Sequence, residues 1–508
     1  MIQISLVFRI LRALFRSGLL SISWRLWPSI FAAWRRCGPS FAWLCEVAAL
    51  RFPGAVALED ELGTLDFRSL WSAVRRQAAA IQGEGLGPGH TLALICPNGR
   101  HFVVGLVAGL HSGANVLPLA VRTPIERLTV LIREQRVSAA FTSESLARVM
   151  REALPETKVL TPTDQSAEHC TQRPGGHLVV LTSGSSGVSK GIDRRPTLAS
   201  LLPVTCGLLE SLPLSLSQPV VLAIPLYHGY GIATLAMSLA LGSRLILSER
   251  YEIDTMVCGV TPSTEAVLVS VPTLLLRWMR SLGDQDATPL KAVITGSAPL
   301  SESLCRELLA KLGPILYNLY GSTEAGLIAL ATPADLQISP GSVGHPLPGN
   351  QVRIVEGGSS VAPGRWGTIE VSGPLVVGPQ ADGWYNTADV GRWEPTGFLR
   401  VSGRADSMVV SGGENVYPHE LEDCLSSHPE VAECAVLAIP DEEFGQRLVA
   451  VLVTTEPSKL DETGLRAWLN PRLERHKHPK TLYFLGSLPR NALGKVAQAE
   501  LRESLNLE

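Results

Sequence analysis

The sequence predicts an α/β protein with a large N-terminal domain of several subdomains, which includes a β unit, and a small C-terminal α+β domain. The chain has 508 residues, whereas one hydrophobic core rarely serves more than about 250–300 residues. From residue 50 onward, apolar runs such as 90–97 and 265–272 alternate with helical stretches, as buried and mostly parallel strands do in α/β layers. From about Gly341 short alternating strands with Gly and Pro turns follow, which indicates antiparallel pairing.

These changes in sequence pattern divide the chain into three segments. Residues 1–49 form a basic, apolar N-terminal segment, residues 50–403 the large domain and residues 404–508 the small domain. In the small domain we expect a helix from Pro418, strands at 433–440 and 448–455, a helix near 462–475 and a strand at 481–486. A segment of about 100 residues is long enough to have its own core.

The composition excludes several classes of protein. With 45% apolar and 18% charged residues, the chain is too apolar to be disordered. Its formal net charge of -3 gives no general attraction to nucleic acid. The nine cysteines are scattered and form no CxxC pair, which argues against a disulfide framework and a cysteine zinc site. A reduced, cytoplasmic compartment fits this pattern best.

Residues 1–45 are basic and rich in tryptophan. They hold no acidic residue, four of the ten tryptophans and six arginines, which are Arg9, Arg12, Arg16, Arg25, Arg35 and Arg36. Because the segment contains no uncharged stretch of about 18 residues, we expect no spanning helix. Two hypotheses remain open: peripheral attachment to the inner membrane surface through anionic lipid, and packing of a leading helix on the main domain.

A Ser- and Gly-rich loop follows the strand expected at 177–183. Its small or hydroxyl residues precede Lys190 and are Thr182, Ser183, Gly184, Ser185, Ser186 and Gly187. Backbone N–H groups, hydroxyl donors and one ammonium group suit a triphosphate. The loop is not a Walker A motif, because Ser189 stands where that motif requires its second glycine. Taken alone, such a loop is also typical of a solvated turn. The neighbouring motifs are therefore needed to choose between a phosphate-binding loop and a solvated turn.

Seven further motifs follow along the chain. They are PLYHGYG (225–231), LKAVITGSAPL (290–300), LYNLYGSTEAG (316–326), GSVGHPLPG (341–349), GWYNTADVG (383–391), GRADSMVVSGGENVYPHELE (403–422) and LPRNALGK (488–495). With the loop at 177–192, they resemble the adenylate-forming superfamily of acyl-CoA synthetases, peptide-synthetase adenylation domains and luciferases. The resemblance covers about residues 50 to 500, and it implies that the small domain is mobile.

The resemblance implies that ATP activates a carboxylic acid. The carboxylate attacks the α-phosphate to give an acyl adenylate and pyrophosphate, and a thiol, as in CoA, then attacks the adenylate. Both steps develop negative charge, which positioned cations and donors stabilise. By resemblance Glu324 holds Mg²⁺, Thr323 and Lys190 contact phosphate, Lys495 bridges carboxylate and α-phosphate oxygens, and His228 borders the acyl carboxylate.

The same resemblance assigns residues to the nucleotide, the thiol donor and the hinge. Asp389 and Arg404 would hold the ribose, and Tyr320 would stack on adenine, while core packing of Tyr320 remains an alternative. Asp406 would mark the hinge between the domains. Further nucleotide contacts are expected at Gly296, Ser297, Ala298, Asn318, Gly321 and Ser322, and close approach of a pantetheine arm at Gly412 and Gly413.

Two positions depart from the family pattern. The family usually has glycine where this chain has Ala388, which adds a methyl group beside the ribose, and often has a second aspartate where this chain has Ser407. Without their motifs, Lys495 would be an ordinary solvated lysine and His228 a structural histidine. The motif context favours the functional interpretation of both residues.

The leading hypothesis is a fatty-acid CoA ligase that uses ATP and Mg²⁺. A ligase for an aromatic or carrier-protein-bound acid would need the same ATP residues, as would an enzyme that activates nitrite for diazotisation. A non-catalytic nucleotide-binding scaffold is a further alternative, against which the intact Lys190, Glu324, Asp389 and Lys495 argue. A luciferase is compatible with the fold, and nothing in the sequence favours it.

Overall fold

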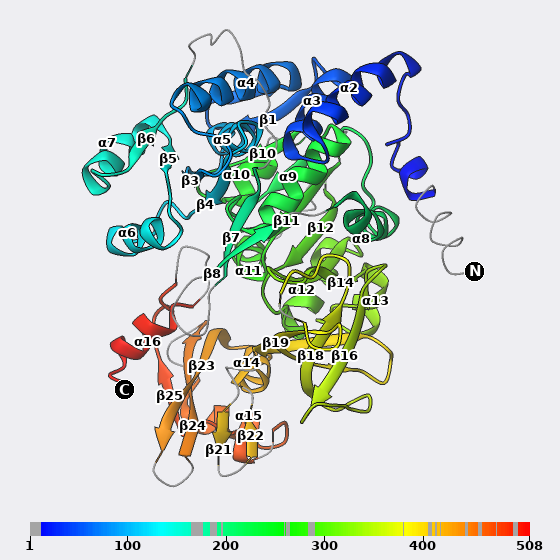
Figure 1. Ribbon diagram of the computed structural model, residues 1–508. Coiled ribbons are helices and arrows are strands. Elements are labelled where there is room, and N and C mark those ends of the chain that lie inside the picture. The colour runs from blue at the N-terminus through cyan, green and yellow to red at the C-terminus, as the bar shows by residue number, and fades with distance from the viewer. Residues whose placement is uncertain are drawn as a thin grey trace.

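The computed structural model describes residues 12–163, 176–182, 190–194, 197–258, 260, 265–282, 290–378, 380–404, 409–411, 414–416, 418–441, 445–455, 460–473, 475–490 and 496–507. A layered α/β body leads through a β unit to a small C-terminal domain (Figure 1). The predicted fold class is therefore confirmed.

One sheet of the body has the strand order β6-β5-β3-β4-β7-β8. Its strands pair in parallel, except that β8 returns antiparallel to β7. They are β3 (Thr91–Ile95), β4 (Asn115–Pro118), β5 (Ala139–Thr142), β6 (Lys158–Leu160), β7 (Leu178–Thr182) and β8 (Lys190–Arg194). The helices of this region are α4 (Phe67–Gly83), α5 (Arg100–His111), α6 (Ile125–Glu134) and α7 (Glu144–Ala153). Helices on its connections bury these strands, which explains their continuous apolar runs.

The second sheet of the body has the order β15-β14-β13-β12-β11-β9-β10-β1-β2. Its central strands pair in parallel, and the strands at both edges pair antiparallel. The strands are β1 (Val56–Asp60), β2 (Gly63–Asp66), β9 (Val220–Leu222), β10 (Leu245–Leu247), β11 (Ala266–Ser270), β12 (Leu290–Gly296), β13 (Leu316–Ser322), β14 (Gly326–Ala331) and β15 (His345–Pro346). The helices are α8 (Leu198–Ser211), α9 (Gly229–Leu241), α10 (Ile253–Cys258), α11 (Pro272–Ser281), α12 (Glu302–Leu312) and α13 (Pro333–Ile338).

The β unit and the C-terminal domain follow in the chain. The β unit is antiparallel, in the order β17-β16-β18-β19-β20, as its alternating sequence predicts. Its strands are β16 (Gln351–Glu356), β17 (Ser359–Ser360), β18 (Gly367–Ser372), β19 (Tyr385–Trp393) and β20 (Leu399–Arg404). The C-terminal domain contains β21 (Val409–Ser411), β22 (Glu414–Val416), α14 (Pro418–Ser426), β23 (Val431–Asp441), β24 (Gly445–Thr454), α15 (Glu462–Leu469), η3 (Arg475–Lys477), β25 (Thr481–Phe484) and α16 (Gln498–Ser504).

The N-terminal segment packs on the body through one face. It contains η1 (Trp24–Leu26), α2 (Trp27–Cys37) and α3 (Phe41–Arg51), which lie above the body in Figure 1. Ala42, Cys45 and Ala48 of α3 belong to the main buried cluster. The boundary expected at residue 49 therefore falls inside a core helix, and the packing hypothesis holds for α3. Among the described residues, no helix is long and apolar enough to cross a membrane.

Candidate active site

A cavity of about 1790 Å³ opens beside the carboxyl ends of the central strands. Pro225, Val271 and Ser297, which follow β9, β11 and β12, lie on its wall. Ligands of open α/β sheets bind at this edge of the sheet. Apolar residues of α8 and α9 form another part of the same wall. Polar groups and an apolar surface therefore meet in one space.

The turn after β12 brings Gly296, Ser297 and Ala298 to the cavity wall. A Cβ atom on Gly296 would lie 2.6 Å from the carbonyl oxygen of Leu319, so the close approach of β13 requires glycine there. Ser297 has a φ of +63°, a left-handed conformation that costs an L-residue roughly 1–2 kcal/mol. Backbone strain of this kind concentrates at functional turns.

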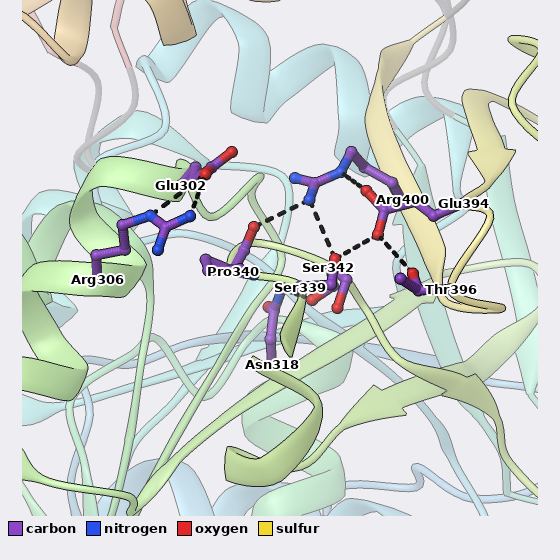
Figure 2. A network of polar contacts seen from close by, with 9 residues as sticks. All are labelled: Glu302, Arg306, Asn318, Ser339, Pro340, Ser342, Glu394, Thr396 and Arg400. Carbon is purple, nitrogen blue, oxygen red and sulfur yellow. Dashed lines mark hydrogen bonds and ion pairs between the residues drawn. The ribbon is translucent and has the colours of Figure 1, made fainter. Parts of the chain in front are cut away.

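Side chains alternate between the two faces of strand β13, so the residues of the NLYGSTE motif do not all face the same side. Leu319 and Gly321 line the cavity, and Asn318 and Tyr320 belong to the other face because side chains alternate along a strand. Asn318 is buried and its Nδ2 donates to the carbonyl oxygen of Ser342 at 2.9 Å, as Figure 2 shows. Asn318 was expected to line the nucleotide site, but the structure places it behind the wall.

Arg400 of β20 fixes the segment that Asn318 contacts. Its Nη2 donates to the carbonyl oxygen of Pro340 at 3.0 Å and to Ser339 Oγ at 3.2 Å, while its Nε donates to Glu394 (Figure 2). This network joins the β unit to the body directly behind the site. The sequence analysis did not identify Arg400, because its partners lie 60 residues or more away in two of these three bonds.

The hairpin between β13 and β14 carries Ser322, Thr323 and Glu324 into the cavity wall. Ser322 Oγ accepts a hydrogen bond from the Ala325 backbone N–H at 3.0 Å, and the Glu324 carbonyl oxygen accepts one from Val377 N at 2.9 Å. These bonds hold the turn, and its half-buried residues Thr323 and Glu324 line the cavity. Among the described residues no group of three or more His, Cys, Asp or Glu forms a metal cluster. One carboxylate suits Mg²⁺ that arrives with nucleotide phosphates, because the phosphates and water supply the other ligands.

Asp389 and Arg404 face each other on neighbouring strands. They pair in the register of β19 and β20, and Arg404 Nη1 lies 3.7 Å from Asp389 Oδ1. Tyr320 Oη donates to Asp389 Oδ2 at 2.6 Å. Burial, followed by the Asp389 carboxylate, raises the pKa of Tyr320 well above its ordinary value, so Tyr320 keeps its proton. Asp389 and Arg404 line the cavity, whereas the Tyr320 ring belongs to the core of the β unit.

His228 lies at the start of α9, where it caps the helix through its backbone position and lines the cavity. Its ring centroid lies 4.4 Å from that of Tyr227. Tyr230, the second residue of α9, donates from its hydroxyl to the Ile294 carbonyl oxygen at 3.1 Å. The sequence analysis did not single out Tyr230. Its position between α9 and β12 makes it a wall residue next to Gly296.

Several predicted site residues lie outside the described part of the chain. They are Ser183, Gly184, Ser185, Ser186, Gly187, Asp406, Gly412, Gly413 and Lys495. The backbone of Thr182 and Lys190 is described, and these two residues pair across β7 and β8. The two residues that flank the Ser- and Gly-rich segment therefore lie side by side. The roles of all these residues stay predictions.

The C-terminal domain reaches the cavity through Arg490. Arg490 lines the wall and its Nη2 lies 2.6 Å from Glu433 Oε2. Glu433 also pairs with Arg280 of α11 at 3.4 Å, and Arg280 donates to the Ala432 carbonyl oxygen. The LPRNALGK motif that begins at residue 488 is thereby anchored near the cavity, at least as far as Arg490.

Comparisons with known proteins agree with this geometry. The sequence pattern described as AMP-binding enzyme matches residues 45–378, and that of the AMP-binding enzyme C-terminal domain matches residues 420–495. The indoleacetate–CoA ligase of Aromatoleum aromaticum is 30% identical over 91% of this chain and 97% of its own length. The 2-succinylbenzoate–CoA ligase of Bacillus licheniformis is 28% identical, with 90% and 98% covered.

Solved structures show the same fold. The o-succinylbenzoate CoA synthetase of Bacillus subtilis, in complex with its acyl-adenylate intermediate, superimposes with a TM-score of 0.81 at 24% identity and covers 90% of this chain and 97% of that one. ATP-bound MatB of Rhodopseudomonas palustris gives 0.79 at 25% identity, with 91% and 98% covered. Since the family pattern covers well over half of the chain, this chain belongs to the AMP-binding enzymes of the adenylate-forming superfamily.

Proposed function

We propose that this protein activates an apolar carboxylic acid with ATP and transfers the acyl group to the thiol of CoA. The observation that carries the proposal is the cavity itself, in which Glu324, Asp389 and Arg404 share one wall with the apolar faces of α8 and α9. The names of the relatives support it, since they include ligases that join indoleacetate, 2-succinylbenzoate and ferulate to CoA.

The proposed reaction has two steps. A carboxylate oxygen of the acid attacks the α-phosphorus of ATP, and the bond to pyrophosphate breaks. The thiol then attacks the acyl carbonyl, loses its proton, and AMP leaves. Asp389 would hold the ribose through a carboxylate that Tyr320 orients from behind, and Glu324 would hold Mg²⁺ beside the phosphates. Lys495 would stabilise the charge that grows in the first step.

We propose a straight-chain fatty acid as the substrate, because the apolar part of the cavity is long. Residues along the whole of α9 line it, from Tyr230 through Ala233 and Met237 to Leu241. Residues Leu201, Thr205, Leu208 and Leu212 line it in the same way from α8 and its end. The aromatic acids named by the relatives provide the alternative.

The experiment that tests this function is pyrophosphate release with a panel of straight-chain acids, aryl acids and nitrite, each with and without CoA. Release that needs a straight-chain acid, and that yields a thioester when CoA is present, supports the proposal. Release with aryl acids alone supports the aromatic alternative, and release with nitrite alone supports a diazotising enzyme. No release with any acid, together with retained ATP binding, would indicate a nucleotide-binding scaffold.

CoA is our proposed acceptor because arginines surround the side of the cavity near Tyr227. Arg122, Arg250 and Arg277 line the cavity and are exposed, and guanidinium groups bind phosphates well. Alanine at Arg250 and Arg277 should raise the KM for CoA and leave the KM for pantetheine unchanged. A carrier protein is the alternative, since one relative is named a fatty acid–[acyl-carrier-protein] ligase. A preference for a loaded carrier protein over CoA would contradict our choice.

We also propose that the outer face of the N-terminal segment binds anionic membrane. Trp24, Trp27 and Phe31, spaced to share one side of η1 and α2, are 77%, 50% and 61% exposed. Arginines stand close by in the sequence, and Arg12, Arg16, Arg25 and Arg35 are exposed. Aromatic side chains beside basic ones suit the interface of an anionic bilayer.

Substitution tests this membrane proposal better than deletion does, because removal of residues 1–45 would cut into the core helix α3. Alanine at Trp24, Trp27 and Phe31 should abolish sedimentation with anionic vesicles and spare turnover of a short acid. Phe484→Ala removes an aromatic ring that is 43% exposed on the C-terminal domain, and it provides the matched control. Equal vesicle binding by both variants would contradict the proposal.

A further inference from the structure

The N-terminal segment forms part of the cavity wall, at the end of the body that lies opposite the β unit (Figure 1). Residues on the wall there belong to the end of α2, the following turn and the start of α3, and they are Cys37, Pro39, Ser40, Phe41, Trp43 and Leu44. The AMP-binding family pattern begins to match only at residue 45. These wall residues therefore precede the part of the chain that the family pattern describes.

The turn between α2 and α3 is built as a fixed element. Gly38 ends α2 with a φ of +56°, which glycine adopts without strain. Ser40 caps α3, since its side chain accepts a hydrogen bond from Trp43 N at 3.2 Å. The Trp43 ring meets the Trp34 ring edge to face, with centroids 5.4 Å apart. The wall is thus held by a cap, a turn and an aromatic pair.

The rest of the segment covers the end of α9 from outside. Ala13 is buried against Leu241 in one apolar cluster, and Leu14 and Leu19 pack on the same cluster together with Met237. Met237 and Leu241 also line the cavity. One part of the segment therefore lines the cavity, and another part packs behind the residues of α9 that line it.

The length of α9 gives the depth of the pocket. Its 13 residues span roughly 20 Å at 1.5 Å per residue. An extended chain advances about 1.2 Å per bond, as a polypeptide backbone does, so roughly sixteen bonds fit between His228 and the end of the helix. A carboxylate near His228 would thus send the tail of a long straight acid along α9 toward the N-terminal segment, which covers the end of that helix.

We infer that Phe41, Trp43 and Leu44 are specificity-determining residues that set the longest acyl chain the enzyme accepts. The inference rests on the proposed fatty-acid function and deepens it. A chain that ends before this wall leaves part of the pocket to water, and a longer chain has no room because α3 is anchored in the core through Ala42 and Cys45. Each methylene group that a shorter chain lacks should lower affinity roughly fourfold, which corresponds to about 0.8 kcal/mol.

Trp43→Ala and Ala240→Leu change the end of the pocket in opposite directions. Removal of the indole should move the acid with the highest kcat/KM to a longer chain by several carbons and raise kcat/KM for acids beyond the wild-type limit about tenfold. A leucine at Ala240, which also lines the cavity, should shorten the limit. The KM for ATP, measured in parallel, separates a change in the acyl pocket from a change at the nucleotide.

The matched control is Trp27→Ala, which removes an exposed tryptophan from the same segment outside the cavity. Its chain-length profile should equal that of the wild type. Thermal unfolding shows whether Trp43→Ala remains folded, and Leu44→Val offers a milder enlargement if it does not. Profiles that stay unchanged in Trp43→Ala, Leu44→Val and Ala240→Leu would overturn the inference.

Two readouts separate this inference from the function on which it rests. Binding of straight-chain acids is measured by calorimetry without ATP, and pyrophosphate release is measured with ATP. A length limit in binding that moves in the variants, without any release, supports the wall and rejects the proposed activation. Release with one unchanged length profile rejects the wall and keeps the function. Neither binding nor release of any straight acid overturns both.

Discussion

Tyr320→Phe distinguishes an effect of the tyrosine hydroxyl from an effect of its ring. The hydroxyl donates to Asp389 Oδ2 at 2.6 Å, and the substitution keeps the packing of the ring in the β-unit core. A hydrogen bond to a charged group contributes about 1.5–3 kcal/mol. Since about 1.4 kcal/mol corresponds to a factor of ten, loss of an oriented ribose ligand should raise the KM for ATP roughly tenfold to hundredfold.

The assay is exchange of labelled pyrophosphate into ATP with saturating acid. Tyr320→Leu removes ring and hydroxyl together and should raise the KM for ATP at least as much. Tyr230→Phe is the matched control, because its buried hydroxyl donates to the Ile294 backbone and lies outside the Asp389 contacts; its KM for ATP should stay within about twofold of the wild type, the scale of a weak neutral hydrogen bond. A wild-type KM in Tyr320→Phe with a raised KM in Tyr320→Leu would refute our reasoning and favour stacking by the ring.

Four more predictions concern other parts of the molecule. Glu324→Gln should raise the Mg²⁺ concentration needed for half-maximal turnover and leave the unfolding temperature unchanged, because an amide replaces one hard anionic ligand; equal Mg²⁺ curves would remove Glu324 from the site. Lys495→Ala should slow adenylate formation by roughly 10² or more and spare thioester formation from supplied adenylate; equal losses in both half-reactions would contradict a role confined to the first. Ala388 has a φ of +57°, so Ala388→Gly should raise the free energy of unfolding by about 1 kcal/mol, measured by denaturant titration, whereas a decrease would show that the methyl group packs favourably. Burial, and after it the charges of Arg75 and Arg36, lowers the pKa of His111 to about 4. Because the folded state disfavours the charged imidazole, the free energy of unfolding should fall by up to about 3 kcal/mol as the pH drops from about 6.5 through 4. His111→Gln should reduce this pH dependence, measured by denaturant titration at each pH.

Residues within a compact motif could be predicted from the sequence, and contacts between distant segments could not. Gly296 and Glu324 stand in motifs at the ends of strands, Asp389 stands in a motif within β19, and the structure brings all three to one cavity. Arg400 was not predicted because its hydrogen-bond partners Ser339 and Pro340 lie about 60 residues away in the sequence. The local pattern of apolar and polar residues carries no information about a hydrogen-bond partner so far along the chain.

The pleat of a strand explains a second difference. A motif suggests that all its residues face the ligand, but alternate residues of a strand face opposite sides. Leu319 and Gly321 therefore line the cavity while Asn318 fixes the turn at Ser342 from behind. The N-terminal segment shows the same limit, since its composition left membrane binding and packing on the body open, and gave no sign that Phe41 and Trp43 would line a cavity.

The polar contacts between the body and the C-terminal domain bear on how the two proposed half-reactions could alternate. The described ion pair that joins them is formed by Arg280 and Glu433, whose side chains remain partly exposed. Exposed pairs of this kind contribute about 0–1 kcal/mol, whereas the interior of the domain has its own apolar core with Val436, Leu448 and Leu465. Loss of this ion pair alone should therefore cost little, and the domain keeps its own core when the pair is broken. Because Glu433 also holds Arg490 at the cavity, release of this one carboxylate from Arg280 would withdraw the segment that leads to Lys495, which is the movement that a second half-reaction without Lys495 requires.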